Sequence, residues 1–295
     1  MPFPRFSVGL ATTPQVSFAG ALAAYREAGA DAIGIVDGPQ LAADPDALAH
    51  FRDSGLRAGF CIPSTTSILP RPQLRASYGG GDDPETRINE ICDSIGRLAI
   101  FEPLFCICVP GPLGEYSADE ARAIAVDGYK RVARAAAGVG VTVALEPLHS
   151  SISEAFSFVH TLPMAIELLD AIDEPNTGVL FDVWHLADTP DVLTHIRRHA
   201  RRFLGVHVND RRDPTRSWSD RVLPGDGIID FPAILGALAD AHYDGWYELE
   251  VLSDDGRYGN AFPDSLWRQD PVDVVRRARE QFMAMWSAVP ANSAQ

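Results

Sequence analysis

The segment Val141-Thr-Val-Ala-Leu-Glu146 is a short apolar run that ends in a carboxylate, and three later segments repeat this pattern. The later segments are Thr177-Gly-Val-Leu-Phe-Asp182, Phe203-Leu-Gly-Val-His207 and Trp246-Tyr-Glu-Leu-Glu250. Their branched and aromatic residues favour buried β-strands, and each run then gives way to a polar loop. The intervals between the runs leave room for the helical crossovers that parallel strands require. The pattern therefore predicts parallel strands that each carry a polar side chain at the carboxyl end.

Apolar strand-like runs alternate with longer helical patterns along the chain, which is typical of a parallel sheet covered by helices. Four earlier strands are expected at Phe6–Leu10, Ala32–Val36, Arg57–Cys61 and Leu104–Val109, which makes eight strand–helix pairs. Eight parallel strands can close into a barrel, and such barrels commonly use about 250 residues as one unit. We therefore predict an α/β fold, a single (β/α)8 TIM barrel over residues 1–290, followed by a disordered tail at 291–295.

Capping residues indicate where several helices begin and end. Ser117 is followed three residues later by Glu120, a capping-box arrangement that starts a helix. Gly29 stands where a glycine would end the preceding helix. The expected helices run from Ser17 to Ala28, from Asp83 to Phe101 and from Ser117 to about Ala137, and two more begin at Asp230 and Pro271.

The composition limits the classes of partner. The chain has 40 Asp and Glu against 25 Lys and Arg, which gives a formal charge of −15 at pH 7. Such a charge repels a polyanion, so we expect no nucleic-acid partner. No apolar run of about 18 residues occurs and the N-terminus lacks a signal-peptide pattern, so we expect no membrane association and a cytoplasmic protein. The four cysteines lack CxxC spacing and are expected to be reduced thiols.

In a closed α/β barrel the catalytic groups lie at the carboxyl ends of the strands, because packed side chains fill the interior. The four polar strand ends, Glu146, Asp182, His207 and Glu250, obey that rule. Three oxygen donors and one imidazole suit a hard or borderline divalent ion, so Mn²⁺ or Mg²⁺ is favoured and Co²⁺ or Zn²⁺ is possible. Any one of the four residues taken alone is better explained as a helix cap or an ion-pair partner.

Five motifs in these segments resemble the xylose isomerase-like barrel superfamily, in particular its sugar-phosphate isomerase and epimerase branch. In chain order they are Leu145-Glu146-Pro147-Leu148-His149, Phe181-Asp182-Val183-Trp184-His185, Val206-His207-Val208-Asn209-Asp210, Pro224-Gly225-Asp226-Gly227 and Tyr247-Glu248-Leu249-Glu250. The resemblance covers most of the chain and is strongest between residues 141 and 270.

The resemblance implies a divalent-metal-dependent sugar isomerase or epimerase whose partner is a small-molecule carbohydrate. It makes Glu146, Asp182, His207 and Glu250 the ligands of one metal ion. The implied reaction removes a proton from the carbon next to a carbonyl and proceeds through an enediolate bound to the metal. The catalytic residues Glu146 and Glu250 would take the proton and return it from opposite sides of the metal.

The resemblance also places His185 and Arg221 toward the substrate. The fork of donors on an arginine suits a hydroxyl, carboxylate or phosphate oxygen, although Arg221 is equally well explained as a surface charge. Trp184 is expected to bind substrate or to belong to the core. It is one of several aromatic residues expected near the barrel mouth, where they could stack on a sugar or an aromatic aglycone: Tyr78, Tyr116, Trp184, Trp218 and Trp267.

One position departs from the branch. Its sugar 3-epimerases carry a further carboxylate six residues beyond the first glutamate, and this chain has Ile152 there. The departure weakens the 3-epimerase interpretation. His149 could serve instead as a catalytic polar or basic group, because an imidazole titrates near neutral pH. The alternative is that His149 only satisfies a neighbouring carbonyl.

Three other activities remain open. A lyase of the C-glycoside deglycosidase type would use the same metal site and often a small second subunit, and a keto-inositol dehydratase would begin with the same proton removal. An apurinic endonuclease shares the barrel but needs more histidines for a zinc cluster, and acidic charge argues against it. The resemblance to the family also implies that the protein is a homo-oligomer.

Overall fold

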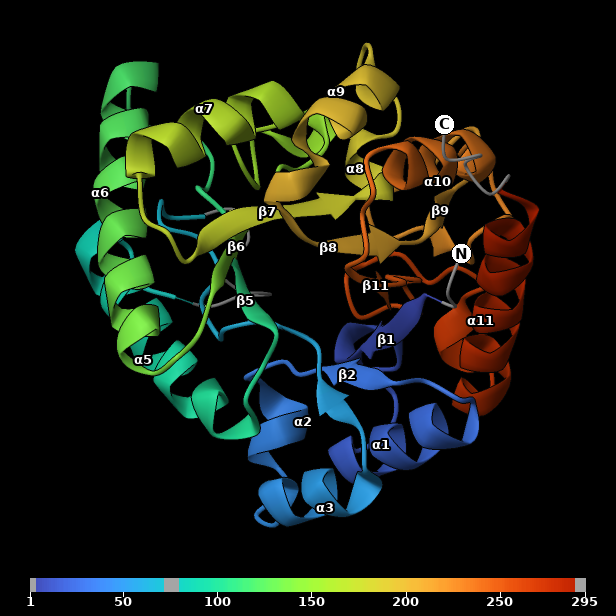
Figure 1. The fold of residues 1–295 in the computed structure, drawn as a ribbon. Helices are drawn as coiled ribbons and strands as arrows, with labels where there is room; N and C mark the ends of the chain where they lie inside the picture. The colour runs from blue at the N-terminus through green and yellow to red at the C-terminus, as the bar shows by residue number, and fades with distance from the viewer. Residues whose placement is uncertain (1–3, 72–79, 290–295) are drawn as a thin grey trace.

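The computed structural model describes residues 4–71 and 80–289, and its centre is a ring of parallel strands surrounded by helices (Figure 1). The strands pair in the order β3-β2-β1-β11-β8-β7-β6-β5-β4. β3 and β4, the two ends of this order, are halves of one chain segment on either side of Gly59, so the ring is closed. The predicted α/β TIM barrel is confirmed.

The barrel strands are β1 (Arg5–Gly9), β2 (Ala32–Gly34), β3 (Arg57–Ala58), β4 (Phe60–Cys61), β5 (Phe105–Cys108), β6 (Val143–Leu145), β7 (Thr177–Asp182), β8 (Phe203–Val208) and β11 (Trp246–Leu249). The α-helices are α1 (Phe18–Glu27), α2 (Pro39–Ala42), α3 (Ala47–Ser54), α5 (Pro84–Leu98), α6 (Ala118–Gly138), α7 (Leu162–Ile172), α8 (Val183–Leu186), α9 (Val192–His199), α10 (Phe231–Asp240) and α11 (Pro271–Ala288).

Most expected boundaries agree with the structure to within a few residues. The Ser117–Glu120 capping box is present at the start of α6, and Asp230 and Asp270 cap α10 and α11. The range 57–61, expected as one strand, is interrupted at Gly59. A Cβ atom at that position would collide with the Ser7 hydroxyl and lie 2.6 Å from Glu248 Oε2, so the main chain there approaches two side chains closely.

The strand residues alternate between two apolar layers. Phe105 and Ile107 of β5 belong to a small cluster enclosed by the strands, which also contains Phe60, Leu180 and Trp246. Cys106 and Cys108, between and after them, belong to the larger cluster that packs the strands against the helices. This alternation follows from the period of two along a strand. The cysteines are free thiols, as expected.

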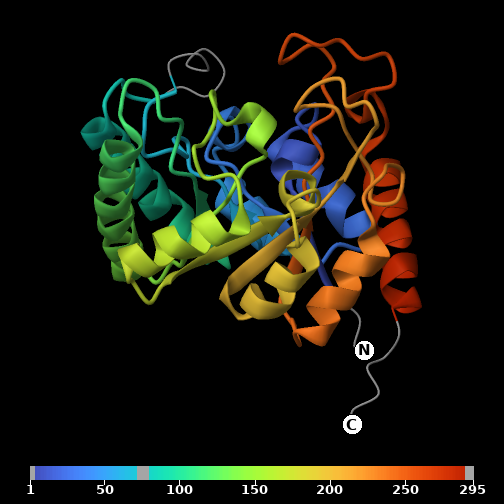
Figure 2. The same cartoon turned by 90° about the horizontal axis from the view of Figure 1, so that it is seen from above.

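Loops above the carboxyl ends of the strands form the upper part of the molecule (Figure 2). One lies between β9 (Asp210–Arg211) and β10 (Arg221–Val222), a small antiparallel pair that was not predicted from the sequence. Another follows β11, and the two loops meet in an isolated bridge between Asp220 and Ser253. None of the described helices is long and apolar enough to cross a membrane. The expected tail, residues 291–295, lies outside the described residues.

Substitution of a buried glycine in β8 tests the packing inside the barrel. Gly205 lies under the rings of Phe60 and Phe105, and a Cβ atom there would collide with the first and lie 2.8 Å from the second. We expect Gly205→Ala to lower the free energy of unfolding by about 1–3 kcal/mol, the usual cost of overpacking. Urea denaturation measures this change in the free energy of unfolding.

The matched control is Gly96→Ala in the last turn of α5, where a Cβ atom would meet nothing within 4 Å. That change should stabilise the protein by up to about 1 kcal/mol, because alanine is the better helix former. Equal effects of the two substitutions would contradict the described packing.

Candidate metal centre

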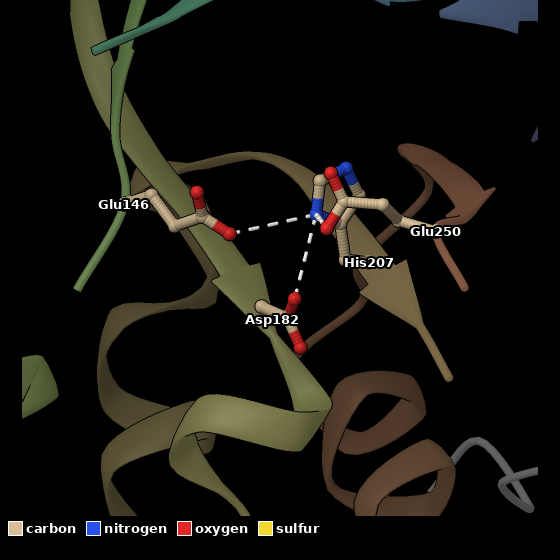
Figure 3. A group of neighbouring side chains, drawn as sticks. All are labelled: Glu146, Asp182, His207 and Glu250. Carbon is tan, nitrogen blue, oxygen red and sulfur yellow. Dashed lines mark ion pairs between the residues drawn. The ribbon is translucent and has the colours of Figure 1, made fainter. Parts of the chain in front are cut away.

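Four side chains from four neighbouring strands converge at the carboxyl end of the barrel (Figure 3). Glu146 directly follows β6, Asp182 ends β7, His207 lies near the end of β8, and Glu250 directly follows β11. β6, β7, β8 and β11 are adjacent in the ring, so their ends meet at one place. One possible ligand atom from each residue lies within 4.8 Å of the others.

His207 stands at the centre of this cluster. Its Nδ1 lies 3.5 Å from Glu146 Oε1, 3.5 Å from Asp182 Oδ2 and 3.5 Å from Glu250 Oε2. Nevertheless both ring nitrogens of His207, and Glu146 Oε1, are buried without a hydrogen-bond partner. Buried polar atoms without partners are rare and call for an explanation such as a bound ion. Three carboxylates and an imidazole that converge without bonding one another fit a divalent metal ion.

The charges in the cluster are strongly coupled. Burial raises the pKa of Glu146 to about 7, against the influence of His207. Burial also opposes the charged form of His207, but the surrounding carboxylates, Glu250 first, outweigh it and raise that pKa well above its usual value. Burial likewise disfavours ionised Asp182, yet Arg221 and the nearby histidines hold its pKa below its usual range. The cluster concentrates negative charge in a form that a divalent cation would compensate.

Asp182 is held in place by three donors. Its Oδ1 accepts hydrogen bonds from the main-chain N–H of Trp184 at 2.7 Å and from Asn209 Nδ2 at 3.3 Å. Its Oδ2 accepts from Arg221 Nη1 at 3.1 Å. The residue is fully buried, so these bonds fix both the position and the ionised state of the carboxylate.

Arg221 joins two members of the cluster. Besides Asp182, its Nη1 donates to Glu250 Oε2 at 2.9 Å. The guanidinium is buried and also lines the cavity described below. Arg221 therefore lines the cavity and also bridges Asp182 and Glu250. The sequence did not indicate this bridge.

His185 lies beside Arg221 and lines the same cavity. Its Nδ1 accepts a hydrogen bond of 3.0 Å from the main-chain N–H of His149. Burial and the positive charge of Arg221 lower the pKa of His185 to about 3, although Asp182 opposes them. The ring is therefore neutral, and its Nε2 lies 3.3 Å from Nη2 of Arg221.

His149 and Trp184 lie behind these cavity residues. The ring of His149 accepts from the main-chain N–H of Ser151 at 3.1 Å, and its Nε2 lies 3.0 Å from Asp188 Oδ2. The buried Trp184 ring packs edge-on against His149 and His185 and lies 5.3 Å from the Arg221 guanidinium. Neither residue is among the described residues that line the cavity. The geometry gives them supporting positions and does not favour direct roles in catalysis or substrate binding.

Glu248 is a site residue that the sequence analysis did not assign. It lies two positions before Glu250 on β11 and is buried inside the barrel, where its Oε1 lies 3.5 Å from His207 Nε2. Ser7 Oγ donates to its Oε2 at 2.5 Å, and the main-chain N–H of Phe60 donates at 3.1 Å. The strand period of two, which puts residues 248 and 250 on one face, was the available signal.

Glycines make room for this buried carboxylate. A Cβ atom at Gly34 would lie 2.8 Å from the carboxyl carbon of Glu248, and one at Gly59 would lie 2.6 Å from its Oε2. Burial raises the pKa of Glu248, against the influence of His207. Glu248 Oε1 therefore lies 3.5 Å from the ring nitrogen of His207 that faces away from the cluster.

A cavity of about 660 Å³ opens beside the cluster. Glu146, His185, Arg221 and Glu250 contribute to one part of its lining, and the rest is largely apolar. Among the aromatic residues expected near the mouth, Trp218 lines this cavity. Trp267 is buried, Tyr116 is not among the described lining residues, and Tyr78 lies outside the described part of the chain.

Known proteins resemble this chain in sequence and in fold. Residues 22–279 match the family model described as xylose isomerase-like TIM barrel. An inosose dehydratase from Erwinia tasmaniensis is 28% identical over 163 residues, which are 47% of this chain and 50% of that protein. A 3-dehydro-D-guloside 4-epimerase from Escherichia coli is 27% identical over 187 residues, which are 61% of this chain and 66% of that protein.

A solved structure has the same fold over nearly its whole length. The protein SMc04130 from Sinorhizobium meliloti superimposes with a TM-score of 0.80 and 27% identity, covering 95% of this chain and 98% of that one. The match to the inosose dehydratase, in contrast, spans only about half the length of that relative.

The position of Glu248 leads to a prediction about metal affinity. Glu248→Gln keeps the shape of the side chain but removes the charge that faces His207 Nε2. Changes of this kind behind a ligating histidine typically cost about 10–100-fold in affinity, and we expect a loss of that size for Mn²⁺. Competition with a fluorescent chelator measures it, and the melting temperature reports on folding.

Glu115→Gln, at an exposed position, is the matched control and should leave the Mn²⁺ affinity unchanged. If Glu248→Gln also left it unchanged in a folded protein, Glu248 would have no part in orienting His207.

Proposed function

The chain belongs to the xylose isomerase-like TIM barrel family, and we propose that it is a metal-dependent enzyme that moves a proton next to a carbonyl group of a carbohydrate. Removal of the proton from one carbon and its return to another carbon or face gives an isomerase or epimerase. The observation that carries this proposal is the convergence of Glu146, Asp182, His207 and Glu250 without hydrogen bonds to His207.

The four residues of the cluster would hold one divalent ion, with Mn²⁺ or Mg²⁺ favoured by the three oxygen donors. Such an ion acts as a Lewis acid that polarises a carbonyl oxygen. Glu146 and Glu250 both line the cavity and lie on different sides of His207 (Figure 3). They are the groups placed to take a proton from the substrate and to return it.

His185 and Arg221 would orient the substrate. His185 offers a neutral imidazole, whereas Arg221 offers a fixed fork of donors. Nη1 of that fork is bonded to Asp182 and Glu250, and its Nη2 lies 3.3 Å from His185 Nε2. Both side chains are buried, so neither has to be ordered when a substrate binds. This preorganised pair suits the hydroxyl and carbonyl oxygens of a sugar.

A dehydratase is the second candidate, because an inosose dehydratase is among the relatives. It begins with the same proton removal next to a carbonyl and differs in the group that leaves. The E. coli relative is named for an epimerisation of a dehydro-guloside, that is, of a keto-sugar in glycosidic linkage. Both names support a carbohydrate that carries a carbonyl group on its ring.

Two interpretations are less favoured. Ile152, at the position where 3-epimerases of the branch carry a carboxylate, lines the apolar part of the cavity, so 3-epimerisation lacks that group. An apurinic endonuclease needs further histidines at the site. Within residues 4–71 and 80–289 there is one cluster with ligand geometry, and His50, His195 and His199 lie on α3 and α9 outside the barrel.

The metal proposal predicts that His207→Ala and Glu146→Gln abolish both metal retention and turnover while the barrel stays folded. Elemental analysis after dialysis measures bound metal. Addition of Mn²⁺ should raise the melting temperature of the unsubstituted protein and not of the variants, because a ligand that binds only the folded state stabilises it by about 2.7 kcal/mol at 100 times its Kd.

His195→Ala on α9 is the control and should retain metal and activity. Full activity in protein shown to contain no metal would contradict the proposal.

The reaction proposal predicts exchange of a carbon-bound proton with solvent. The metal-loaded enzyme in deuterated buffer is followed by NMR with free ketoses, phosphorylated ketoses, keto-inositols and 3-keto glycosides. We expect loss of one proton signal next to the carbonyl of the accepted substrate. The product then separates isomerisation, epimerisation and elimination.

Product formation without any exchange, with a hydride moving between carbons instead, would contradict a proton-transfer mechanism at Glu146 and Glu250. Glu250→Gln should then be no slower than the unsubstituted enzyme.

A further inference from the structure

Glu250 lies just beyond the regular pairing of β11. The last paired residue of that strand is Leu249, which lies opposite Val8 of β1 and Val208 of β8. β1 is followed directly by a 3-10 helix, η1 (Leu10–Thr12). The ladders to both neighbouring strands therefore stop one residue before Glu250, and other groups have to hold the main chain there.

The side chain of Thr12 continues the pairing at this point. Its hydroxyl donates a hydrogen bond of 3.0 Å to the carbonyl of Leu249 and accepts one of 3.1 Å from the main-chain N–H of Val251. A hydroxyl can donate and accept at the same time, so both bonds form together. Thr12 is 2% exposed, so water does not compete with either bond.

These two bonds hold the two peptide groups that flank Glu250. The carbonyl of Leu249 belongs to the peptide group before Glu250, and the N–H of Val251 belongs to the one after it. Each peptide group is planar, so the orientations of the two planes fix both backbone dihedral angles of Glu250. Those angles decide where its Cβ atom points. Thr12 therefore acts on the direction in which the carboxylate leaves the main chain.

The turn that carries Thr12 is itself held in place. The main-chain N–H of Thr13 donates to the carbonyl of Leu10 at 3.2 Å, and the Thr13 hydroxyl lies 2.6 Å from the hydroxyl of Tyr25. Tyr25, which is fully buried on α1, also donates to the carbonyl of Gly9 at 3.2 Å. The turn is thus fixed to α1, which gives the Thr12 hydroxyl a defined position.

Other bonds hold the chain further along. The indole Nε1 of Trp267 donates to the carbonyl of Val251 at 3.1 Å, and the main-chain N–H of Arg221 donates to the carbonyl of Leu252 at 2.9 Å. Both of these carbonyls belong to peptide groups that come after Val251. The bonds of Thr12, in contrast, act on either side of the cluster residue.

The direction of Glu250 matters because its carboxylate has two partners in the cluster. Oε2 lies 3.5 Å from Nδ1 of His207 and accepts a hydrogen bond of 2.9 Å from Nη1 of Arg221. The carboxylate oxygens lie four bonds from the Cα atom, so a small rotation of the main chain displaces them further than it displaces the Cα atom. An error in the peptide planes would therefore reach the cluster.

We propose that Thr12 is a positioning residue of the metal centre, whose hydroxyl holds Glu250 in the direction that closes the cluster around the ion. The inference rests on the proposed function, which makes Glu250 a metal ligand. A hydroxyl that only satisfied two buried main-chain groups would affect the stability of the fold and leave the metal affinity unchanged.

Two substitutions at Thr12 test this role. Thr12→Val keeps approximately the shape of the side chain and removes both bonds, whereas Thr12→Ser keeps the hydroxyl. Loss of a group that orients a metal ligand typically costs about 10–100-fold in metal affinity. We therefore expect Thr12→Val to weaken Mn²⁺ binding about tenfold or more and Thr12→Ser to bind nearly as tightly as the unsubstituted protein. Competition with a fluorescent chelator measures the affinity, and circular dichroism reports on folding.

Thr177→Val is the matched control, because it makes the same change at the opposite end of the barrel. The hydroxyl of Thr177, the first residue of β7, donates to the carbonyl of Glu174 at 2.7 Å. Its loss should lower the melting temperature and leave the Mn²⁺ affinity unchanged. If Thr12→Val does not fold, Thr12→Ala removes the same hydroxyl from a smaller side chain and carries the same expectation.

The visible absorption of bound Co²⁺ gives a second readout, because it depends on the ligands around the ion. At saturating Co²⁺, Thr12→Val should change the spectrum in the same sense as Glu250→Gln. Thr177→Val should give the spectrum of the unsubstituted protein, because a loss of stability alone does not alter the ligands.

The outcomes separate this inference from the proposed function. If Glu250→Gln weakens Mn²⁺ binding but Thr12→Val does not, or if Thr12→Ser weakens it as much as Thr12→Val, the role of the Thr12 hydroxyl is overturned and the proposed function stands. If the unsubstituted protein does not bind Mn²⁺, or if Glu250→Gln binds it equally tightly, the metal site of the proposed function fails and the inference fails with it.

Discussion

The concentration of carboxylates at the carboxyl end of the barrel is the constraint on which the rest of the site depends. Glu146, Asp182 and Glu250 meet around one imidazole nitrogen in a buried place, where like charges repel strongly. Arg221 compensates part of this charge through Asp182 and Glu250, and His207 compensates another part. Glu146 Oε1 remains without a partner. The arrangement is therefore best satisfied by a cation, and it leaves one carboxylate oxygen next to the cavity.

Contacts of the cluster extend into the interior of the barrel. Glu248 lies 3.5 Å from Nε2 on the far side of the His207 ring, and Ser7 and the main chain of Phe60 hold Glu248 by hydrogen bonds. A carboxylate fits inside the barrel only because residues 34 and 59 are glycines. The closure of the barrel between β3 and β4 occurs at Gly59, so the same position closes the barrel and makes room for Glu248.

The order of the strands decides which elements supply the residues that line the cavity. Among the polar lining residues, Glu146 and Glu250 directly follow β6 and β11, His185 lies on α8, and Arg221 begins β10. Phe156, Trp218 and Tyr258 line the cavity from the loops that follow β6, β9 and β11. The polar groups and these aromatic rings therefore belong to the same half of the barrel. In such folds the strands fix the reacting groups and the loops set the specificity, so the loops could change without disturbing the cluster.

The sequence by itself determined the barrel and the convergence of four of its polar residues. Strand and helix periods repeat eight times, and the carboxyl ends of parallel strands in a closed barrel necessarily face one side, so Glu146, Asp182, His207 and Glu250 had to be neighbours. The positions of Glu248, Arg221 and His149 around the cluster were decided only by the tertiary structure. Whether a side chain lines the cavity or supports a neighbour depends on its rotamer and on contacts between strands far apart in the chain. Glu248 meets Ser7 only because β11 pairs with β1 when the barrel closes, and no local pattern encodes that contact.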